Sequence, residues 1–313
     1  MKSLQVIVKV TTACNLKCVY CSEGDKAELY MKQETLHKLI DDLPELADAC
    51  RTKRIDILWH GGEPLMMPKK ILSEAMEYAQ KRLQGYDIRF LMQTNATLVT
   101  PDWIQIFQKY HVEVGVSMDG YRQLHDANRR KKDGSPSYDE VIHHIHDLQK
   151  ADISVGTLMV LNTEQPVDLE QLYTCIRELH TGIKIHPVIP CGRAKENKEA
   201  ELIYRNYIIL LEALYEKVIE DEEPVIIDPL NELLNAILGI CPVKECSFAG
   251  TCCNGLICVY TDGSVGYCGR DSIHDKFLFG NIQNASLKEL YMSAQAEYIR
   301  QRQAYLQQHD CKN

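Results

Sequence analysis

The sequence lacks the apolar segments that place a protein in or across a membrane. It has no stretch of about 18 apolar residues, so it has no segment that would span a bilayer. Met1-Lys-Ser leads directly into a strand-like run, without the apolar core and small-residue cleavage site of a signal peptide. These absences predict a cytoplasmic protein with no membrane partner.

An excess of positive charge is also missing. The 35 Lys and Arg residues face 44 Asp and Glu residues, which gives a net charge of -9. This balance argues against broad attraction to nucleic acid. Hydrophobic content of 45% and charged content of 25% are those of an ordinary globular protein. With 313 residues, and neither a low-complexity tract nor a Gly/Ser linker, the chain fits one barrel-sized domain or a large domain with a smaller one.

Cysteine, by contrast, is abundant. Thirteen cysteines without a secretion signal predict reduced thiols and metal ligands in place of disulfides. Three lie at 14–21 and six at 241–268, and these nine are the metal-ligand candidates. Cys50 and Cys175 fall in amphipathic helical segments, where we expect small core residues. Cys191 and Cys311 also stand apart.

The first cysteine cluster has CxxxCxxC spacing. Cys14, Cys18 and Cys21 follow the apolar run Leu4–Val10 in one short loop. Three thiolates can hold three corners of a cubane iron–sulfur cluster, and the fourth iron is then open to bind a small molecule and pass it an electron. Ferredoxin-type sites and most zinc sites instead supply four protein ligands. The alternative is three unrelated buried cysteines.

Strand-like runs alternate with helical segments six times. The strand-like runs are Leu4–Val10, Ile55–Trp59, Ile88–Met92, Val112–Ser117, Ile153–Leu161 and Ile183–Val188. The helical segments between them are Gln33–Ala49, Pro68–Leu83, Pro101–Tyr110, Ser137–Ala151 and Asp168–His180, with cap oxygens expected from Thr100 and Ser137. This alternation predicts an α/β fold, a partial (β/α)6 TIM-like barrel with its chemistry at the carboxyl ends of the strands.

The pattern changes after residue 190. Helical segments are expected at Lys195–Glu222, Asp228–Leu238 and Leu287–Gln308. A hairpin is expected from Leu256–Tyr260 and Ser264–Tyr267 around a Gly-containing turn. We therefore divide the chain into a barrel at 1–190, a helical linker at 191–240 and a small cysteine-rich domain at 241–313.

Further motifs follow the predicted strands. They are His60-Gly61-Gly62-Glu63-Pro64, Gln93-Thr94-Asn95, Ser117-Met118-Asp119-Gly120 and His125-Asp126-Ala127-Asn128-Arg129. Together with the cysteine loop, this succession resembles the radical S-adenosylmethionine enzymes, and within them the SPASM/twitch subgroup. The resemblance implies that S-adenosylmethionine chelates the open iron of a [4Fe–4S] cluster. A reduced cluster then cleaves it to a 5'-deoxyadenosyl radical, which abstracts a hydrogen atom from the substrate.

The resemblance also implies roles for single residues. Gly61, Gly62 and Glu63 would contact the methionine amino group, and the glycines allow close backbone approach. Tyr20 would pack near the adenine. Ser117 and Arg129 are candidates for the carboxylate and ribose of the cofactor, although Arg129 also starts a basic run that solvent could surround.

The second cysteine group resembles the SPASM/twitch domain. Gly263 and Cys268 fit its Gly-x4-Cys element. The ligands expected for at least one auxiliary [4Fe–4S] cluster are Cys246, Cys252 and Cys268, with Cys253 as the rival of Cys252. A structural zinc is the alternative. Cys241 and Cys258 are core thiols or substitute ligands.

The sequence departs from the family pattern in two places. A full SPASM domain continues with CxxCx5Cx3C and a later cysteine, whereas this sequence ends at Cys311-Lys-Asn313. We therefore expect a shorter twitch-like form or a truncated SPASM enzyme. The sulfatase-maturing branch carries an acid directly after the hairpin cysteine, where this chain has Gly269, with Asp271 two residues further on. This difference lowers the expectation of sulfatase maturation.

The resemblance favours a peptide- or protein-modifying enzyme that crosslinks, oxidises or epimerises a ribosomally made precursor peptide. The alternatives are a radical dehydrogenase of a small carbohydrate-like alcohol, an anaerobic sulfatase maturase, or a metal scaffold without catalysis. Expected partners are flavodoxin or ferredoxin as electron donor and a separate leader-peptide-binding protein, because only Met1-Lys-Ser precedes the first strand. Catalytic acid–base candidates are Asp119 and Asp271, with His125, Asp126 and His274 as further polar residues in the same loops.

Overall fold

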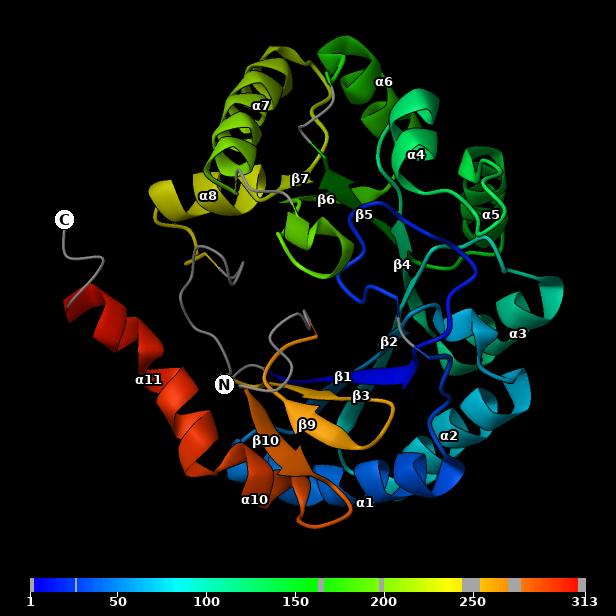
Figure 1. Cartoon of the computed structure of the whole chain (residues 1–313), viewed down its shortest axis with the longest axis vertical. Helices are drawn as coiled ribbons and strands as arrows, with labels where there is room; N and C mark the ends of the chain where they lie inside the picture. The colour runs from blue at the N-terminus through cyan, green and yellow to red at the C-terminus, as the bar shows by residue number, and fades with distance from the viewer. Residues whose placement is uncertain are drawn as a thin grey trace.

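Ten strands form one continuous sheet in the computed structural model, which describes residues 3–25, 27–162, 166–196, 200–243, 254–269 and 277–308 (Figure 1). Their spatial order is β10-β9-β8-β1-β2-β3-β4-β5-β6-β7. The strands are β1 (Leu4–Thr11), β2 (Arg54–Gly61), β3 (Asp87–Thr94), β4 (Glu113–Ser117), β5 (Val155–Leu161), β6 (Gly182–Pro187), β7 (Ile227–Asp228), β8 (Leu256–Val259), β9 (Ser264–Gly266) and β10 (Leu278–Asn281).

Strands β1 to β6 pair in parallel, and the connecting helices cover the outer face of the sheet (Figure 1). The helices of this part are α1 (Gln33–Ala49), η1 (Pro64–Met66), α2 (Lys69–Arg82), α3 (Pro101–Tyr110), α4 (Arg122–Asn128), α5 (Tyr138–Lys150) and α6 (Leu169–Leu179). The helices after β6 are η2 (Gly192–Glu196), α7 (Ala200–Glu220), α8 (Leu230–Ile237), α10 (Leu287–Tyr291) and α11 (Ala294–Gln308). The predicted α/β class and partial (β/α)6 barrel are confirmed.

The predicted C-terminal hairpin is confirmed as β8 and β9, and it lengthens the barrel sheet. Strand β8 pairs in parallel with β1, and β9 and β10 then follow in antiparallel order. Pairing with β8 covers the edge of β1, which would otherwise present unpaired backbone groups. The division into three domains stays a prediction. The hairpin and the first cysteine loop nevertheless share β1 as a common support.

The structure differs from the sequence prediction at short elements. The helix α4 and the strands β7 and β10 were not predicted, because two to seven residues carry too little periodicity. The predicted helix Leu287–Gln308 is two helices, since Ser293 separates them and its Oγ accepts a hydrogen bond from Ala296 N at 3.3 Å.

Side chains cap the first turns of α3 and α5, one as predicted and one not. The Thr100 side chain accepts a hydrogen bond from Trp103 N at the start of α3, as predicted. The expected cap at Ser137 is wrong, because Asp126 Oδ1 accepts from both Ser137 N and Tyr138 N at 3.0 Å. The freed Ser137 hydroxyl donates to the Arg129 carbonyl at 2.5 Å, which ties the start of α5 to the candidate site.

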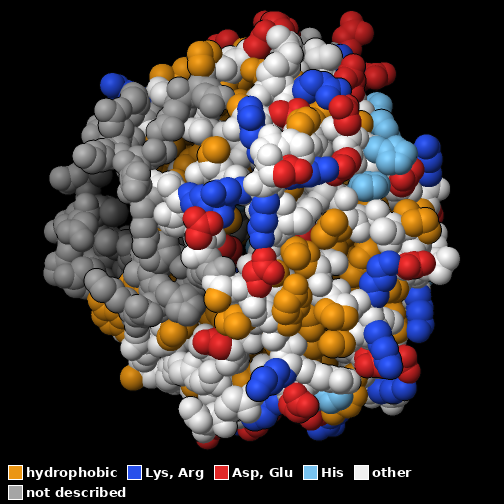
Figure 2. All heavy atoms as spheres, turned by 45° about the vertical axis from the view of Figure 1, so that its right-hand side comes forward, with side chains coloured by type: hydrophobic (Ala, Val, Ile, Leu, Met, Phe, Trp, Pro, Cys, Tyr) orange, Lys and Arg blue, Asp and Glu red, His pale blue; other side chains and the backbone are white. Residues whose placement is uncertain are grey.

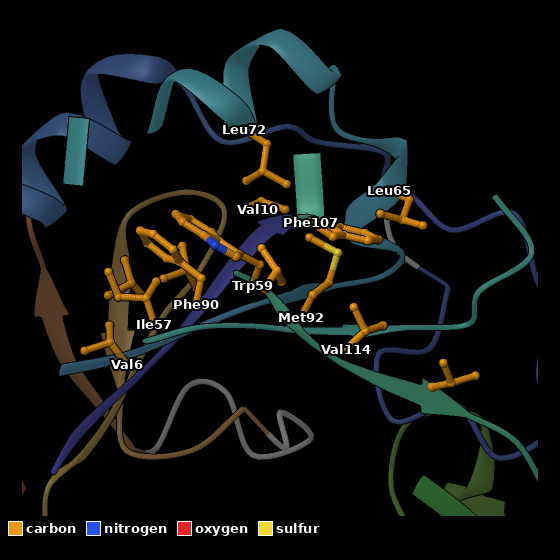
Figure 3. Close-up of a cluster of buried hydrophobic side chains, with 14 of the residues drawn as sticks. Val6, Val10, Ile57, Trp59, Leu65, Leu72, Phe90, Met92, Phe107 and Val114 are labelled. Atoms are coloured by element: carbon orange, nitrogen blue, oxygen red, sulfur yellow. The ribbon is translucent and has the colours of Figure 1, made fainter. Parts of the chain in front are cut away.

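The main core lies between the sheet and the helices α1 to α3 (Figure 3). Along β1 the side chains of Val6, Val8 and Val10 are fully buried, because alternate residues of a strand face the same side. Trp59 stacks on Phe90 with ring centroids 6.3 Å apart. Cys50 and Cys175 are buried, which confirms their interpretation as core residues. This core holds in place the strands β1 to β4, and the candidate site lies at their carboxyl ends.

The outer surface mixes charges of both signs. On the face shown in Figure 2, Lys and Arg side chains alternate with Asp and Glu side chains and form no broad patch of one sign. None of the described helices combines the length and hydropathy needed to cross a bilayer.

Candidate functional site

The loop that carries Cys14, Cys18 and Cys21 follows β1 at the carboxyl edge of the sheet. It lies antiparallel to the segment after α4, where Lys17 N donates to Arg130 O at 2.7 Å and Val19 N to Asn128 O at 2.9 Å. The three cysteine residues are partly exposed and form no disulfide. The chain therefore presents three thiols from one pinned loop.

The Gly61–Glu63 segment binds the start of this loop through its backbone. Gly62 N donates to Thr11 O and Glu63 N to Ala13 O, both at 2.8 Å. An added Cβ on Gly62 would lie 2.3 Å from Ala13 O, and Gly61 has a φ of 143°. Both positions thus require glycine, because any side chain would push the two segments apart.

The Glu63 carboxylate is buried and saturated with donors. It accepts hydrogen bonds from Leu65 N at 3.0 Å, Thr94 Oγ1 at 2.6 Å and Asn95 N at 2.7 Å. Burial nevertheless raises the pKa of Glu63 to about 7, because desolvation outweighs these hydrogen bonds. Glu63 therefore holds the end of β3 against the start of the cysteine loop.

Cys14 lies at this Glu63 side of the loop. Its sulfur accepts a hydrogen bond from Leu16 N at 3.4 Å and approaches Asn95 Nδ2 at 3.9 Å. Asn95 Nδ2 also donates to Asn15 Oδ1 at 2.9 Å. Burial, with a smaller contribution from the Glu63 charge, raises the pKa of Cys14 to about 12. A bound metal must therefore displace a proton to make this thiol a ligand.

A buried network occupies the opposite side of the loop. The Asp119 carboxylate accepts hydrogen bonds from Tyr20 OH and, at 3.1 Å, from Val160 N. Arg129 Nε lies 3.0 Å from Asp119 Oδ2, and its guanidinium carbon lies 5.3 Å from the centre of the Tyr20 ring. Arg129 is 7% exposed, so it is not part of a solvated basic run.

This geometry assigns Asp119 a different task from acid–base catalysis. Its side chain is fully buried, and the hydrogen bonds from Tyr20 and Val160 engage both carboxylate oxygens. It is therefore better placed to hold Tyr20 and Arg129 than to meet a substrate. The roles predicted for Tyr20 and Arg129 toward the cofactor stay predictions.

His125 and Asp126 support the network of Tyr20, Asp119 and Arg129. His125 Nδ1 accepts a hydrogen bond from Asp119 N at 3.3 Å, and its Nε2 lies 3.0 Å from Ser137 Oγ. Burial lowers the pKa of His125 to about 3, with the Arg129 charge acting in the same direction, so the ring is neutral. Asp126 caps α5 as described above.

A third group of polar side chains lines the inner face of the sheet. Gln93 Nε2 donates to Ser117 Oγ at 2.9 Å, and Lys9 stands beside His60 in the register of β1 and β2. Lys9 is 2% exposed and forms an ion pair with Glu23. No sequence motif marks the Lys9–Glu23 pair, although an isolated lysine inside an apolar strand is a usable signal.

Arg193, in η2 after β6, is a further residue that contacts the cysteine loop. Its Nη1 donates to Cys18 O at 2.9 Å and its Nη2 contacts Asp25 Oδ1 at 2.6 Å. Its backbone N–H donates to Cys21 O at 3.0 Å. Its position after a barrel strand was the available signal, but no motif marked it.

The second cysteine group is only partly described. Cys268 is partly exposed after β9, and its carbonyl accepts a hydrogen bond from Tyr260 OH at 2.7 Å. Cys258 is fully buried in β8 and Cys241 is partly exposed. The predicted ligands and acid–base candidates Cys246, Cys252, Cys253, Asp271 and His274 lie outside the described residues. Their roles stay predictions.

The first loop fits a three-thiolate iron–sulfur cluster. Three free thiols come from one loop, the Gly61–Glu63 segment packs closely against the start of that loop, and two arginines supply positive charge near Cys18. Cys14, Cys18 and Cys21 would hold the cluster, which supplies a one-electron reduction when S-adenosylmethionine is bound. Other residues of this chain hold the loop in place through the hydrogen bonds described above.

Comparison with known proteins agrees with this interpretation. The model of the Radical SAM superfamily matches residues 8–176, and the SPASM model, an iron-sulfur cluster-binding domain, matches residues 252–313. The chain belongs to the radical SAM superfamily. It is a radical SAM enzyme, and the predicted cofactors are confirmed: S-adenosylmethionine, its [4Fe–4S] cluster and an auxiliary iron–sulfur cluster.

Relatives of this radical SAM chain include two sulfatase-maturating enzymes. A serine-type anaerobic sulfatase-maturating enzyme of Bacteroides thetaiotaomicron is 37% identical over 183 residues, which are 55% of this chain and 44% of that protein. A cysteine-type enzyme of Clostridium novyi is 25% identical over 94% of this chain and 80% of its own. The chain thus spans less than half of the first relative and most of the second.

A solved structure gives a similar alignment in space. Native anSMEcpe with bound AdoMet and Kp18Cys peptide has a TM-score of 0.85 and 25% identity, covering 96% of this chain and 83% of that one. The similarity therefore includes the barrel and the described part of the C-terminal region.

Proposed function

We propose that this enzyme abstracts a hydrogen atom from a side chain of a peptide or protein substrate. The observation that carries the proposal is the structural similarity over 96% of the chain to anSMEcpe, whose structure contains a bound peptide. Similarity confined to the barrel would fit any radical SAM chemistry. Similarity that extends through the hairpin also fits a shared class of substrate.

The inner polar layer supports a peptide substrate. Partly exposed His60, Gln93 and Ser117 side chains stand on neighbouring strands at the edge where the cysteine loop begins. Such side chains can pair with the amide groups of a peptide backbone, which need partners once they leave water. Because the cysteine loop follows β1 at this edge of the sheet, a radical formed at the loop would arise near this layer.

Oxidation of a cysteine or serine side chain is the first candidate reaction. Two relatives are sulfatase-maturating enzymes of the serine and cysteine types, and one of them aligns with nearly the whole chain. In this reaction the substrate carbon gives one hydrogen atom to the adenosyl radical. The thiol or hydroxyl group would then give its proton to a base, and the carbon-centred radical would give one electron to the auxiliary cluster, which leaves a carbon–sulfur or carbon–oxygen double bond.

Modification of a ribosomally made precursor peptide is the second candidate, and Gly269 favours it. The position after Cys268 carries no carboxylate, and an added Cβ on Gly269 would lie 3.3 Å from Ile7 Cδ1 and 3.7 Å from Lys9 Cε. The base for a sulfatase-type oxidation must then come from elsewhere in the site. A crosslinking or epimerising enzyme would not need a base at the position that the sulfatase-type oxidation requires.

The test uses the full chain, reconstituted anaerobically with iron and sulfide and reduced with dithionite. Peptide pools with one central cysteine or serine, deuterated at Cβ, are incubated with S-adenosylmethionine, and an alanine pool is the control. We expect deuterium in 5'-deoxyadenosine and a dehydrogenated peptide only with the cysteine or serine pools. Cleavage that no peptide stimulates, or deuterium transfer from a small polyol instead, would contradict a peptide substrate.

A further inference from the structure

Arg193 joins the two later cysteines of the loop to the segment after β6. The Cys18 carbonyl accepts from Arg193 Nη1 at 2.9 Å, and the Cys21 carbonyl accepts from Arg193 N at 3.0 Å. Gly192 brings these segments together, because an added Cβ there would lie 2.1 Å from Cys21 O. Backbone carbonyls of two cluster-ligand residues are thus fixed by one neighbouring residue.

The same side chain retains an unused donor. Arg193 Nε is buried and makes no hydrogen bond within the described part of the chain. Nη2 reaches outward to Asp25, whose side chain is 76% exposed. The guanidinium therefore has a solvent-facing partner on one edge and an unpaired N–H on the other. A buried N–H without an acceptor is costly, so this donor favours the arrival of an acceptor next to the loop.

The charge of Arg193 lies at the backbone of the cluster loop. Its Nη1 is 2.9 Å from the carbonyl oxygen of Cys18, a residue that would hold the cluster. A cluster held by three thiolates becomes more negative by one charge when it accepts an electron. A fixed cation nearby stabilises that reduced state more than the oxidised one.

We propose that Arg193 is a positioning residue that raises the reduction potential of the radical SAM cluster. It does so by fixing the Cys18 and Cys21 backbone and by placing its positive charge next to the cluster loop. Asp25 opposes this effect, because its carboxylate partly neutralises the guanidinium from the solvent side. The proposal depends on the cluster loop alone and not on the identity of the substrate.

The test is a redox titration of the reconstituted enzyme without substrate, followed by electron paramagnetic resonance. The electron comes from dithionite, and the cluster is the species reduced. Cys246→Ala, Cys252→Ala, Cys253→Ala and Cys268→Ala are combined in the background so that signals of the auxiliary cluster are removed. In that background Arg193→Gln should lower the ratio of reduced to oxidised cluster about tenfold at a fixed potential, which is ~59 mV for one electron.

Asp25→Asn provides the opposite test. It should raise the reduced fraction about twofold, because Arg193 then keeps its charge without a neutralising partner. Loss of packing alone cannot move the two variants in opposite directions. Arg205→Gln, at an exposed position of α7, should leave the titration unchanged.

The outcomes separate the alternatives. Opposite shifts support the proposal even if peptide modification fails in every assay. An unchanged potential in Arg193→Gln, or a fall in both variants, would overturn it. If Arg193→Gln does not assemble a cluster, Asp25→Asn still decides: a higher potential supports the proposal and an unchanged or lower one contradicts it.

Discussion

The two sides of the cysteine loop differ in their chemistry. At Cys14 the neighbours are the Gly61–Glu63 backbone, the Glu63 carboxyl group and Asn95. At Cys18 the neighbours are two arginines, Arg129 and Arg193. We call these the acidic side and the arginine side.

The difference teaches how an amino-acid ligand would be oriented at such a loop. The acidic side offers a carboxyl group whose pKa burial raises to about 7, and the arginine side offers fixed positive charge. An ammonium group and a carboxylate would therefore favour opposite sides. The roles predicted for Glu63 and Arg129 toward the cofactor stay predictions.

Removing all three thiols should have the largest effect on activity, because it removes the ligands of the cluster that lies between the acidic side and the arginine side. The triple variant Cys14→Ala, Cys18→Ala, Cys21→Ala should lose the S-adenosylmethionine-cleaving cluster and form no 5'-deoxyadenosine. Iron quantification against the wild type then counts the auxiliary clusters that remain. Cys50→Ala, a change at a buried core thiol, is the control and should keep its iron. Equal iron in the triple variant would remove these cysteines as ligands.

Breaking the arginine side should have the next largest effect. Arg129→Leu leaves the fully buried Asp119 carboxylate without its cation, which should cost about 3–5 kcal/mol of unfolding free energy. Urea unfolding of the apoprotein measures this loss. The double variant with Asp119→Leu should recover part of it, because no unpaired charge remains. Arg130→Gln, at the exposed neighbouring residue, is the control, and a loss as large there would contradict a specific ion pair.

The acidic side was easier to predict from the sequence than the arginine side. Gly61 and Gly62 indicate a close approach of two backbone segments, because a side chain at either position would collide with the facing segment. The two glycines also belong to one contiguous motif. Barrel strands were equally clear, since buried parallel strands are continuous apolar runs. The six long runs therefore fixed the order of β1 to β6.

The arginine side depends on contacts between distant parts of the chain. Arg193 reaches Cys18 across 175 positions, and no local pattern encodes such a contact. Arg129 could be part of a surface basic run until its burial beside Asp119 was known. Ser137 showed the same limit, because Asp126 took its capping role and left its hydroxyl for Arg129 O. The positions and partners of Arg193, Arg129 and Ser137 therefore depend on tertiary contacts, which a local sequence pattern does not encode.

On the acidic side, the titration of Glu63 should make the unfolding free energy depend on pH. Its folded pKa of about 7 lies above the ordinary 4.5, so the folded state holds its proton longer than the unfolded state. Stability from this group is complete below pH 4.5 and falls by about 3 kcal/mol as the pH rises to 7. Glu63→Gln should abolish this slope, although it lowers stability at all pH values because its amide faces other donors. Urea unfolding of the apoprotein at a series of pH values measures both effects, and an unchanged slope would refute the assignment.

Titration of His125 should show the opposite slope on the arginine side. Its folded pKa of about 3 lies below the ordinary 6.5, so the unfolded state takes up the proton first as the pH falls. Stability is complete above pH 6.5 and should be lower by about 2 kcal/mol at pH 5. His125→Asn keeps an acceptor for Asp119 N and should remove this acid-side loss. His111→Asn, at an exposed helix end, is the matched control. Because the Glu63 and His125 slopes have opposite signs, they partly cancel in the wild type between pH 4.5 and 6.5, so the unfolding free energy of either single variant should change more steeply with pH in this range than that of the wild type.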